Sequence, residues 1–569
     1  MDNKSIIKLL NSTATLLALH GANPFQVKHY TNAALFLERL GKEVITLSQE
    51  ELKQIEGINK GVISLVQEIQ IAGTLHRWQE LVEKTPPGVL DILELPGLGP
   101  KKVSLLWQQL GIQNLSELEE ACKSGKVAQL AGFGEKTQAA ILQSLTQRRQ
   151  YQDKFHYATV LAYASTLESA LGKSFPSLIQ APIGDFRRKV EIITTLEWLV
   201  AASDLIAIKE WLCELPNIKQ DQTISGPFAW RGYFVDNQLP LHILFCDQKE
   251  FYKQLIIQTE SVQHLNLPVG SDKTLGQIIN QLTDLSSEED AYAQAGLPYV
   301  PPELREGIVE HAWIKAGAPS LIELADLQGI FHIHTTYSDG QNSLESMATH
   351  CKNLGYSYIG ITDHSQSAAY AGGLKLYTIQ QQHEAIDELN RQLAPFKIFK
   401  GIESDILPDG SLDYPDEVLS KFDFIIASVH MGLNMDEIKA TERLIKVISN
   451  PFTTMLGHPT GRLLLKREGY PIDHKAVIDA CATYGVMIEI NANPWRLDLD
   501  WHWIPYALEK GVQLSINPDA HHIDEIANMK YGVYMGRKGG LTKDDTFNTW
   551  PLKVVEDYFQ NRKAANLKR

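Results

Sequence analysis

Histidines and carboxylates recur through the last part of the chain, from about residue 326 onward, in a pattern that could hold metal ions. The set comprises His332, His334, Asp339, His364, Glu403, His430, His458, Asp519 and His521. Imidazole and carboxylate ligands without thiolates are typical of working Zn, Mn or Fe sites rather than of structural zinc. Because nine ligands exceed the needs of one ion, the sequence predicts two or three clustered divalent ions, which suit the hydrolysis of phosphoesters.

The spacing of these residues predicts the elements that position them. His332, His364, Glu403, His430 and His458 follow one another at intervals of 27 to 39 residues, and one βα unit takes roughly 30 residues. Each belongs to or follows a short apolar run, so we expect it at the carboxyl end of a strand in a parallel sheet or barrel, where catalytic residues gather. The runs are 329–334, 358–362, 398–403, 424–430, 456–458, 487–491 and 512–517, of which 456–458 is the least strand-like.

Neighbouring residues are candidates for supporting roles. Arg462 and Arg496 could each clamp a phosphate, and a surface position without function is the alternative for both. Asp363 is expected to orient His364 or its strand rather than to bind an ion. No role is predicted for His474, His502 and His522.

Three glycine turns divide an otherwise helical first section, residues 1–150. They centre on Gly57, Gly97 and Gly132, and in helix–hairpin–helix motifs such turns expose backbone N–H groups to DNA phosphates. In the first turn Asn59 replaces a second glycine, and asparagine tolerates a left-handed conformation. Three ordinary helix–loop–helix turns are the alternative. The predicted DNA contacts are Gly57, Gly61, Gly97, Gly99, Lys101, Lys102, Gly132, Gly134 and Lys136.

Composition excludes several classes of protein. The 569 residues carry a net charge of −15, and residues 1–150 hold 16 Lys and Arg against 15 Asp and Glu, so the rest of the chain carries −16. This excludes a strongly basic nucleic-acid binder but allows DNA contact through the first section. No apolar run is long enough for a membrane span, no signal-peptide pattern is present, and five scattered cysteines argue against a disulfide scaffold. We therefore expect a multidomain cytoplasmic protein that is not membrane-bound.

The quoted residues resemble a known family. The motifs His-x-His, Ser-Asp-Gly, Ile-Thr-Asp-His-Ser, Gly-Ile-Glu-Ser-Asp-Ile, Ala-Ser-Val-His, Leu-Gly-His-Pro-Thr-Gly-Arg and Pro-Asp-Ala-His are similar to those of a PHP (polymerase and histidinol phosphatase) domain. The whole chain resembles a bacterial family X DNA polymerase with such a domain at its C-terminus, also through 23–25, 296–305 and 548–552. Pro518 stands where that family commonly has Thr.

The resemblance implies a distorted (β/α)7 barrel with a trinuclear site and a Mn-dependent 3′–5′ exonuclease, in some members with cleavage at abasic sites or removal of 3′-blocking groups. It implies catalytic roles for His332, His334, Glu403 and Asp519. The first ion would take these four residues, the second Glu403, His430 and His458, and the third Asp339, His364 and His521.

The region that resembles the polymerase palm departs from the family. Gly184-Asp185-Phe186-Arg187-Arg188 keeps the pattern except that Asp185 replaces serine, the Asp-x-Asp register falls on Thr195-Leu196-Glu197, and the third aspartate position falls near Pro240. Nucleotidyl transfer needs clustered carboxylates for two Mg ions, and Thr and Pro cannot replace them. We expect no Mg in the palm and no nucleotide addition. The lysine of lyase-active members falls at Leu65, so lyase activity is not expected.

These observations predict an organisation and a function. We expect an α-helical N-terminal domain with the first hairpin at 1–85, a fingers-like hairpin region at 86–150, an α+β nucleotidyltransferase-like palm at 151–235, a thumb-like region and linker at 236–325, and the PHP phosphoesterase domain at 326–569. The leading hypothesis is a DNA-repair phosphodiesterase that acts on gapped, nicked or 3′-ended DNA held through its backbone. The alternatives are an active polymerase with Asp185 or Glu191 as substitute ligands, a histidinol-phosphate-like phosphatase of small molecules, and a non-catalytic DNA-binding scaffold.

Overall fold

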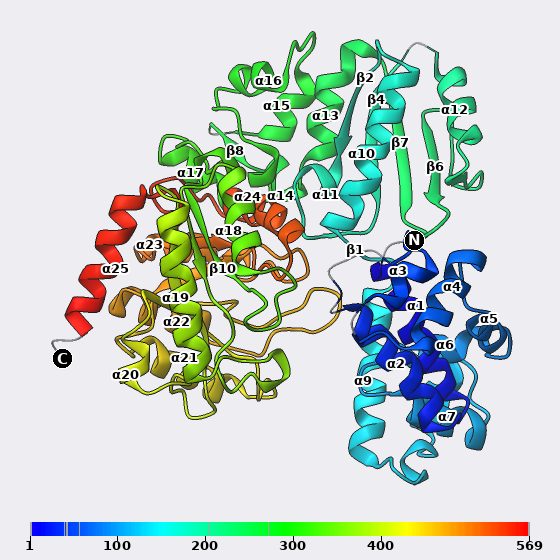
Figure 1. Cartoon of the computed structure of the whole chain (residues 1–569). Helices are drawn as coiled ribbons and strands as arrows, with labels where there is room; N and C mark the ends of the chain where they lie inside the picture. Colours follow the sequence, from blue (N-terminus) through cyan, green and yellow to red (C-terminus); the bar gives the residue numbers. More distant parts are fainter. Residues whose placement is uncertain are drawn as a thin grey trace. The chain divides into compact units, whose positions relative to one another are not determined.

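The computed structural model describes residues 3–38, 40, 44–55, 57–202, 204–270 and 272–566 (Figure 1). The chain divides into two compact units, residues 1–152 and 153–569. Among the described residues, no helix combines the length and the apolar character that crossing a membrane requires.

The first unit is helical. Its helices are α1 (Asn3–Leu19), α2 (Pro24–Glu38), α3 (Gln49–Lys53), α4 (Lys60–Ala72), α5 (His76–Glu83), α6 (Pro87–Leu93), α7 (Pro100–Leu110), α8 (Leu115–Lys123) and α9 (Glu135–Tyr151). Two apolar cores hold it together, one around Val66 of α4 and one around Leu106 of α7. The three predicted turns lie immediately before α4, α7 and α9.

Each of the three hairpin turns uses glycine at the same point. Gly57, Gly97 and Gly132 have φ values of 84°, 78° and 84°, which L-residues with a side chain rarely adopt. The expectation of a left-handed Asn59 was wrong. Asn59 is extended, with φ −105°, and its side chain caps α4 by accepting a hydrogen bond from the N–H of Val62, a role for which asparagine is well suited.

The second unit begins with a five-stranded sheet in the order β2-β4-β7-β6-β5. Its strands are β2 (Ile179–Ile183), β4 (Leu196–Ala201), β5 (Ile218–Gln220), β6 (Ala229–Phe234) and β7 (Pro240–Cys246), and only β4 and β7 pair in parallel. Because β7 lies in the middle of the sheet, the sheet continues beyond the palm boundary predicted at residue 235. A two-stranded ribbon of β1 (Phe155–His156) and β3 (Ile192–Ile193) lies beside α10 (Tyr157–Ser174).

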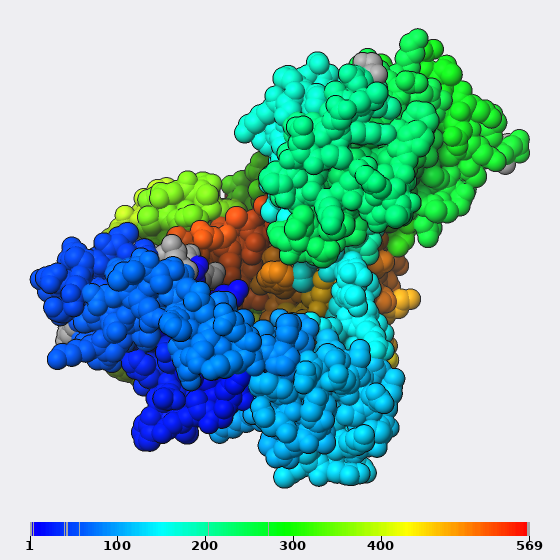
Figure 2. Space-filling model, turned by 90° about the vertical axis from the view of Figure 1, so that its right-hand side faces the viewer, coloured from blue at the N-terminus to red at the C-terminus, as the bar shows by residue number. Residues whose placement is uncertain are grey.

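Short helices lie between the strands of the sheet and, after the sheet, in the thumb-like region. These are α11 (Gly184–Arg187) and α12 (Leu205–Glu214) within the sheet segment, then α13 (Phe251–Thr259), α14 (Val262–Leu265), α15 (Leu275–Gln281), α16 (Glu288–Gln294) and α17 (Glu310–Lys315), with a small ribbon of β8 (Pro268–Val269) and β9 (Lys273–Thr274). Figure 2 shows palm and thumb residues as one continuous surface that runs from turquoise to green. Arg187 of α11 donates to Glu288 of α16 at 2.9 Å, which ties the two parts together.

The last 240 or so residues form the predicted barrel. Seven parallel strands follow in chain order: β10 (Gly329–Ile333), β11 (Tyr358–Ile361), β12 (Lys397–Asp405), β13 (Phe424–Ser428), β14 (Met455–Leu456), β15 (Met487–Asn491) and β16 (Leu514–Asn517). The main helices are α18 (Leu344–Asn353), α19 (Leu376–Gln392), α20 (Asp416–Leu419), α21 (Glu437–Ile448), α22 (His474–Tyr484), α23 (Ile504–Glu509), α24 (Met529–Lys538) and α25 (Leu552–Asn566). Ala520 bridges to Ile333 and brings the last strand back to the first. The prediction of a seven-stranded βα barrel is confirmed.

Candidate metal centre

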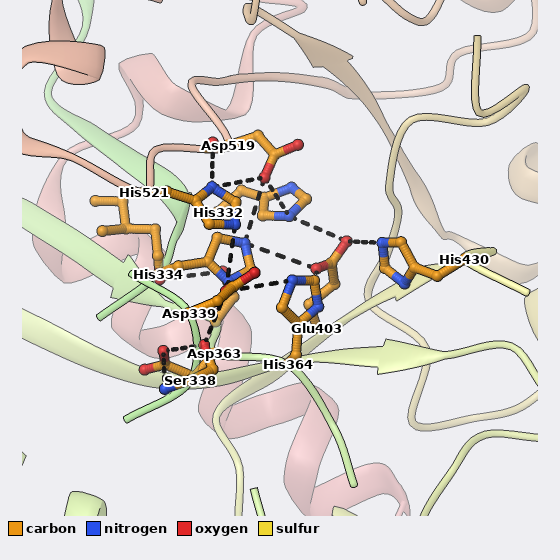
Figure 3. Close-up of polar contacts among 12 residues, drawn as sticks. His332, His334, Ser338, Asp339, Asp363, His364, Glu403, His430, Asp519 and His521 are labelled. Atoms are coloured by element: carbon orange, nitrogen blue, oxygen red, sulfur yellow. Dashed lines mark hydrogen bonds and ion pairs between the residues drawn. The ribbon is translucent and has the colours of Figure 1, made fainter. Parts of the chain in front are cut away.

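All nine predicted ligands meet at the carboxyl-terminal rim of the barrel. Eight of them are labelled in Figure 3, where the imidazoles and carboxylates point toward one another. Their ligand atoms form four overlapping groups that could each hold an ion: His334, Asp339, His364 and His521; His332, Glu403 and His458; His332, His334 and Asp519; and His364, Glu403 and His430. Among the residues that the structure describes, no group of this kind lies outside the barrel rim.

Glu403 lies at the centre of the cluster. One of its carboxylate oxygens is 3.2 Å from Nε2 of His332, 3.3 Å from Nε2 of His430 and 3.0 Å from Nε2 of His458. The other oxygen is 2.9 Å from Nδ1 of His364. A carboxylate with both oxygens facing imidazoles in this way is placed to bridge two ions, as the sequence suggested for this residue.

Two further carboxylates flank this centre. Asp339 Oδ1 lies 3.6 Å from Nε2 of His364 and 3.4 Å from Nε2 of His521. Asp519 Oδ1 lies 3.3 Å from Nε2 of His334. His334 also belongs to the group around Asp339, so it stands between two of the predicted ion sites rather than in one of them.

Three of these residues have backbone conformations that side chains normally avoid. The φ values of His332, His458 and Asp519 are 60°, 23° and 51°. Left-handed non-glycine residues cost about 1–3 kcal/mol each and gather at functional sites, where the surrounding structure holds them. His332 lies near the end of β10, and His458 and Asp519 each lie two residues after β14 and β16, so these conformations occur where the ligands meet.

Several imidazoles are fixed through Nδ1. Nδ1 of His332 lies 2.6 Å from Oε1 of Glu489, and Nδ1 of His430 lies 2.5 Å from Oδ1 of Asp405. Nδ1 of His521 donates to the backbone carbonyl of Asp519 at 3.1 Å. A partner on Nδ1 fixes the ring and leaves Nε2 to bind a cation, which is the usual arrangement around metal-binding histidines.

Glu489 is a supporting residue for which the sequence predicted no role. This fully buried residue of β15 also accepts hydrogen bonds from the N–H of His458 and from the side chains of Asn491 and Asn517. The signal was present, since Glu489 and Asn491 are polar residues two apart in an apolar run and therefore lie on one face of a strand. Their partners, however, come from other strands.

Unpartnered buried atoms indicate that cations fit this site. His332 Nε2, both ring nitrogens of His334, His364 Nδ1, Glu403 Oε2 and His458 Nδ1 are buried without a hydrogen-bond partner. Leaving buried polar atoms unpaired costs about 1–3 kcal/mol each. Nitrogen and oxygen donors of this kind suit Mn, Zn or Fe, and their number fits more than one ion.

The electrostatics keep the carboxylates ionised. Burial alone would raise the pKa of Glu403, but the charges of His430 and His332 outweigh it and hold that pKa well below its usual value. Burial likewise opposes ionisation of Asp339, and hydrogen bonding from His521 together with nearby histidine charges lowers its pKa to about 2. Burial and the neighbouring histidines lower the pKa of His334 to about 3. At neutral pH His334 therefore keeps a lone pair for a cation.

Comparisons with known proteins cover all parts of the chain. Family models match a PHP domain at residues 331–493, a helix-hairpin-helix domain at 1–75 and a SAM-like helix-hairpin-helix tandem at 89–146. A Bacillus subtilis protein named DNA polymerase/3′-5′ exonuclease PolX is 35% identical over 98% of this chain and 100% of its own length. The chain belongs to the bacterial family X DNA polymerases with a C-terminal PHP domain. Its barrel is accordingly a metal-dependent phosphoesterase domain.

Other relatives match the PHP domain alone. A probable phosphatase of Thermoanaerobacter sp. strain X514 is 27% identical over 38% of this chain and 94% of its own length. A probable phosphatase of Caldicellulosiruptor saccharolyticus is 30% identical over 40% of this chain and 86% of its own length. Each of these relatives is thus matched over most of its own length by less than half of this chain.

Asp363 has a different partner from the one expected. Its carboxylate accepts hydrogen bonds from the backbone and side chain of Thr335, from Ser338 and from Gln382, and no hydrogen bond joins it to His364. It therefore fixes the loop that carries Asp339. Of the two expected roles, the orientation of His364 is not what the PHP domain shows, because the loop after β10 folds over this carboxylate. The other role, fixing the strand before His364, stays a prediction.

The two candidate phosphate-binding arginines differ. Arg462 donates to the backbone carbonyls of Arg496 and Leu497 and to Asp500, so its guanidinium is occupied within the protein and unsuited to clamp a phosphate. Arg496 reaches the metal centre, where its Nε lies 3.4 Å from Oδ2 of Asp519. Of the two, only Arg496 faces the place where a phosphate would bind.

The palm positions lie together but bring few carboxylates. The register of β4 and β7 pairs Leu196 with Leu241 and Glu197 with His242, so Thr195 and Pro240 each come one residue before the first pair. Glu197 faces His242 at 4.0 Å and lies against Gly184, and burial, reinforced by the charge of Asp185, raises its pKa.

The other candidate palm groups are engaged in ion pairs. Asp185 pairs with Arg188, while Arg188 and Arg187 also bind thumb-region acids. Glu191, the other candidate substitute ligand, points to Arg462 of the PHP domain.

The hairpin residues occupy the predicted turns. Gly99 and Gly134 are the N-cap residues of α7 and α9, and neither has a side chain to cover the helix N–H groups. Lys101 and Lys136 are exposed in the first turns of these helices, while Lys102 donates back to the carbonyl of Gly97 at 3.3 Å. Gly61 has a packing role, because a Cβ there would meet His29 at 2.4 Å.

Proposed function

We propose that this protein is a DNA-repair nuclease that hydrolyses phosphodiesters from the 3′ end of DNA in its PHP domain. The observation that carries the proposal is the convergence of nine imidazole and carboxylate side chains with unpartnered buried atoms. The helix-hairpin-helix domains and the full-length likeness to a polymerase/3′-5′ exonuclease favour DNA as the substrate. We further propose Mn as the first choice of cation, with Zn or Fe as the alternatives.

The residues of the site have distinct tasks in this mechanism. Divalent cations would supply Lewis-acid polarisation of the phosphate and a more acidic water. Glu403, Asp519 and the histidines hold those cations, and Glu489 fixes His332. Arg496 binds the scissile phosphate beside Asp519, since a guanidinium matches phosphate geometry. A histidine or aspartate at the rim gives a proton to the leaving 3′-oxygen.

We propose that the palm does not add nucleotides and binds no Mg. Thr195 and Pro240 offer no carboxylate, and the carboxylate of Asp185 is paired with Arg188. Two Mg ions need clustered carboxylates to hold a triphosphate. The palm and thumb then serve as scaffold, and the hairpins hold gapped, nicked or 3′-ended DNA through its backbone. Abasic-site cleavage, 3′-end processing and a cytoplasmic location remain predictions.

A nuclease assay tests the proposal directly. A 5′-labelled primer–template is incubated with the protein and Mn in the absence of nucleotides, and we expect stepwise shortening of the primer. A His332→Ala/His334→Ala variant should shorten it at least 100-fold more slowly, on the order of what loss of a multinuclear site costs, whereas His350→Ala in α18 should behave like wild type. Undiminished shortening by the double variant would place the activity elsewhere.

The PHP-only relatives favour a second candidate. Their printed names describe probable phosphatases, so the barrel could instead hydrolyse small phosphomonoesters such as a histidinol-phosphate-like compound. Turnover of p-nitrophenyl phosphate and of a sugar phosphate is compared with turnover of the DNA primer under the same Mn concentration. A much larger kcat/KM for the small phosphate would select this candidate over the nuclease.

A further inference from the structure

One loop of the barrel contacts both the metal centre and the palm. This loop, residues 492–500 between β15 and the short helix at Trp501–Trp503, carries Arg496 into the site. Within the loop the N–H groups of Arg496 and Leu497 both donate to the carbonyl of Asn493, at 2.8 and 3.0 Å. This tight turn fixes the path of the loop backbone. It does not hold the loop against the barrel, which needs other contacts.

A second barrel loop provides part of that attachment. The N–H of Leu464 donates to the carbonyl of Trp495 at 2.6 Å, and Nε of Arg462 donates to the carbonyl of Arg496 at 2.8 Å. Arg462 also pairs with Asp500 at the far end of the loop. With the bond from Arg462 to the carbonyl of Leu497, the segment 462–464 therefore holds the Arg496 loop at four points.

The palm holds both loops through one histidine. Nε2–H of His156 in β1 donates to the carbonyl of Leu464 at 2.9 Å, and its ring packs edge-to-face on Trp495 with centroids 4.1 Å apart. Burial lowers the pKa of His156, which suits a neutral ring in this position. Glu191, next to β3, adds a longer contact of 3.9 Å to Arg462.

The ribbon of β1 and β3 anchors His156 within the palm. Residue His156 pairs with Ile192, and the N–H of Tyr157 donates to the carbonyl of Glu191 at 2.9 Å. Tyr157 in turn stacks on Phe186 of α11 with centroids 4.9 Å apart. His156 is therefore joined to the palm core on one side and to the Arg496 loop on the other.

We propose that His156 of the palm is a positioning residue for Arg496 in the PHP site. This inference rests on the proposed hydrolysis of phosphodiesters there and names a task that the palm performs without nucleotide addition. By holding Leu464 and Trp495, His156 keeps the Arg496 guanidinium beside Asp519, where the phosphate binds. Removal of either His156 contact lets the loop sample positions in which Arg496 no longer meets the phosphate.

The decisive experiment is a double-mutant cycle on the full chain. We expect Arg496→Ala to lower kcat/KM on the labelled primer about 10- to 100-fold, because it loses a charge-assisted hydrogen bond. His156→Ala should lower kcat/KM roughly 3- to 10-fold. The loss should be shared between kcat and KM in the same proportion as in Arg496→Ala. In the Arg496→Ala background, His156→Ala should change kcat/KM less than two-fold. A full additional loss in that background overturns the inference.

Rescue variants and a matched control separate positioning from folding. His156→Gln can still donate to Leu464 and His156→Phe can still pack on Trp495, so each should recover part of the loss. His383→Ala is the control, since His383 is another half-buried histidine with an edge-to-face contact, to Phe422 at 5.0 Å. It should leave kcat/KM within two-fold, and equal losses in both variants would contradict the inference.

A measurement without activity distinguishes failure of this inference from failure of the proposed function. Hydrogen–deuterium exchange of the metal-free protein is followed at the amides of Leu464, Arg496 and Leu497, which are hydrogen-bonded in the two loops. His156→Ala should speed their exchange at least ten-fold, and His383→Ala should not. Unchanged exchange refutes the positioning role, whatever the wild-type protein does to DNA.

Discussion

Glu489 of β15 holds Nδ1 of His332 of β10 at 2.6 Å, and its other oxygen accepts a hydrogen bond from the N–H of His458. One buried carboxylate thus fixes two residues of the metal centre from a third strand. Because Nδ1 of His332 is occupied, Nε2 is the atom that faces Glu403.

Glu489→Gln should weaken cation binding without emptying the site. Glutamine keeps the size of the side chain but loses the charge that fixes His332, and loss of such an outer partner typically costs 10- to 100-fold in metal affinity. Isothermal titration with Mn of the chelator-treated protein measures the change. Glu345→Gln, at an exposed position in the first turn of α18, is the control and should bind like wild type.

Primer extension tests the palm independently of the nuclease. In the His332→Ala/His334→Ala variant no shortening competes, so we expect no product longer than the primer when dNTPs and Mg are supplied. The physical reason is the missing carboxylates at Thr195 and Pro240. Extension by this variant that disappears in Glu197→Gln would show that the palm still works with substitute ligands.

The hairpins should control DNA affinity through backbone contacts. Replacing Lys101 and Lys136 together by alanine should raise Kd several-fold for every DNA sequence and reduce the slope of log K against log salt by about two, roughly 0.9 for each lost phosphate contact. Fluorescence anisotropy with a labelled gapped duplex at several salt concentrations measures both. Lys123→Ala, whose lysine pairs with Glu119 away from the turns, should leave the slope unchanged.

Acid should weaken the joint between palm and thumb. Burial would raise the pKa of Glu288, but hydrogen bonds and charges from Arg187 and Arg305 hold it below its usual value. A lowered folded-state pKa stabilises the protein above the ordinary glutamate pKa of 4.5, and this contribution is lost as pH falls through the folded-state pKa. Glu288→Gln should cost about 3 kcal/mol at pH 7.

Urea unfolding of this variant and of wild type, at pH 7 and near pH 3.5, measures that difference. The gap in the free energy of unfolding should shrink at the lower pH, because Glu288 of the unfolded wild-type chain then binds a proton that the folded protein resists. A gap that grows on acidification would contradict the assignment.

The sequence by itself determined which residues form the ligand set and that they lie at the carboxyl-terminal rim of the barrel. Histidines and carboxylates at the ends of apolar runs, spaced by one βα unit, must meet at one rim when the strands pair in parallel, as His332, Glu403 and His430 do. The three turns could also be predicted from local sequence, because Gly57, Gly97 and Gly132 adopt the left-handed conformation that each turn requires before its helix. Local periodicity and local backbone conformation need no knowledge of distant partners.

Only the tertiary structure decided which groups support that set. Glu489 contacts Nδ1 of His332. Arg462 donates to backbone carbonyls and to Asp500, and not to a phosphate. His156 is hydrogen-bonded to Leu464, 308 residues further along the chain. Hydrogen bonds of buried polar groups go to whichever unpaired atom the packing brings near. That choice depends on how strands and domains close on one another, which is a property of the assembled chain and not of any segment of it.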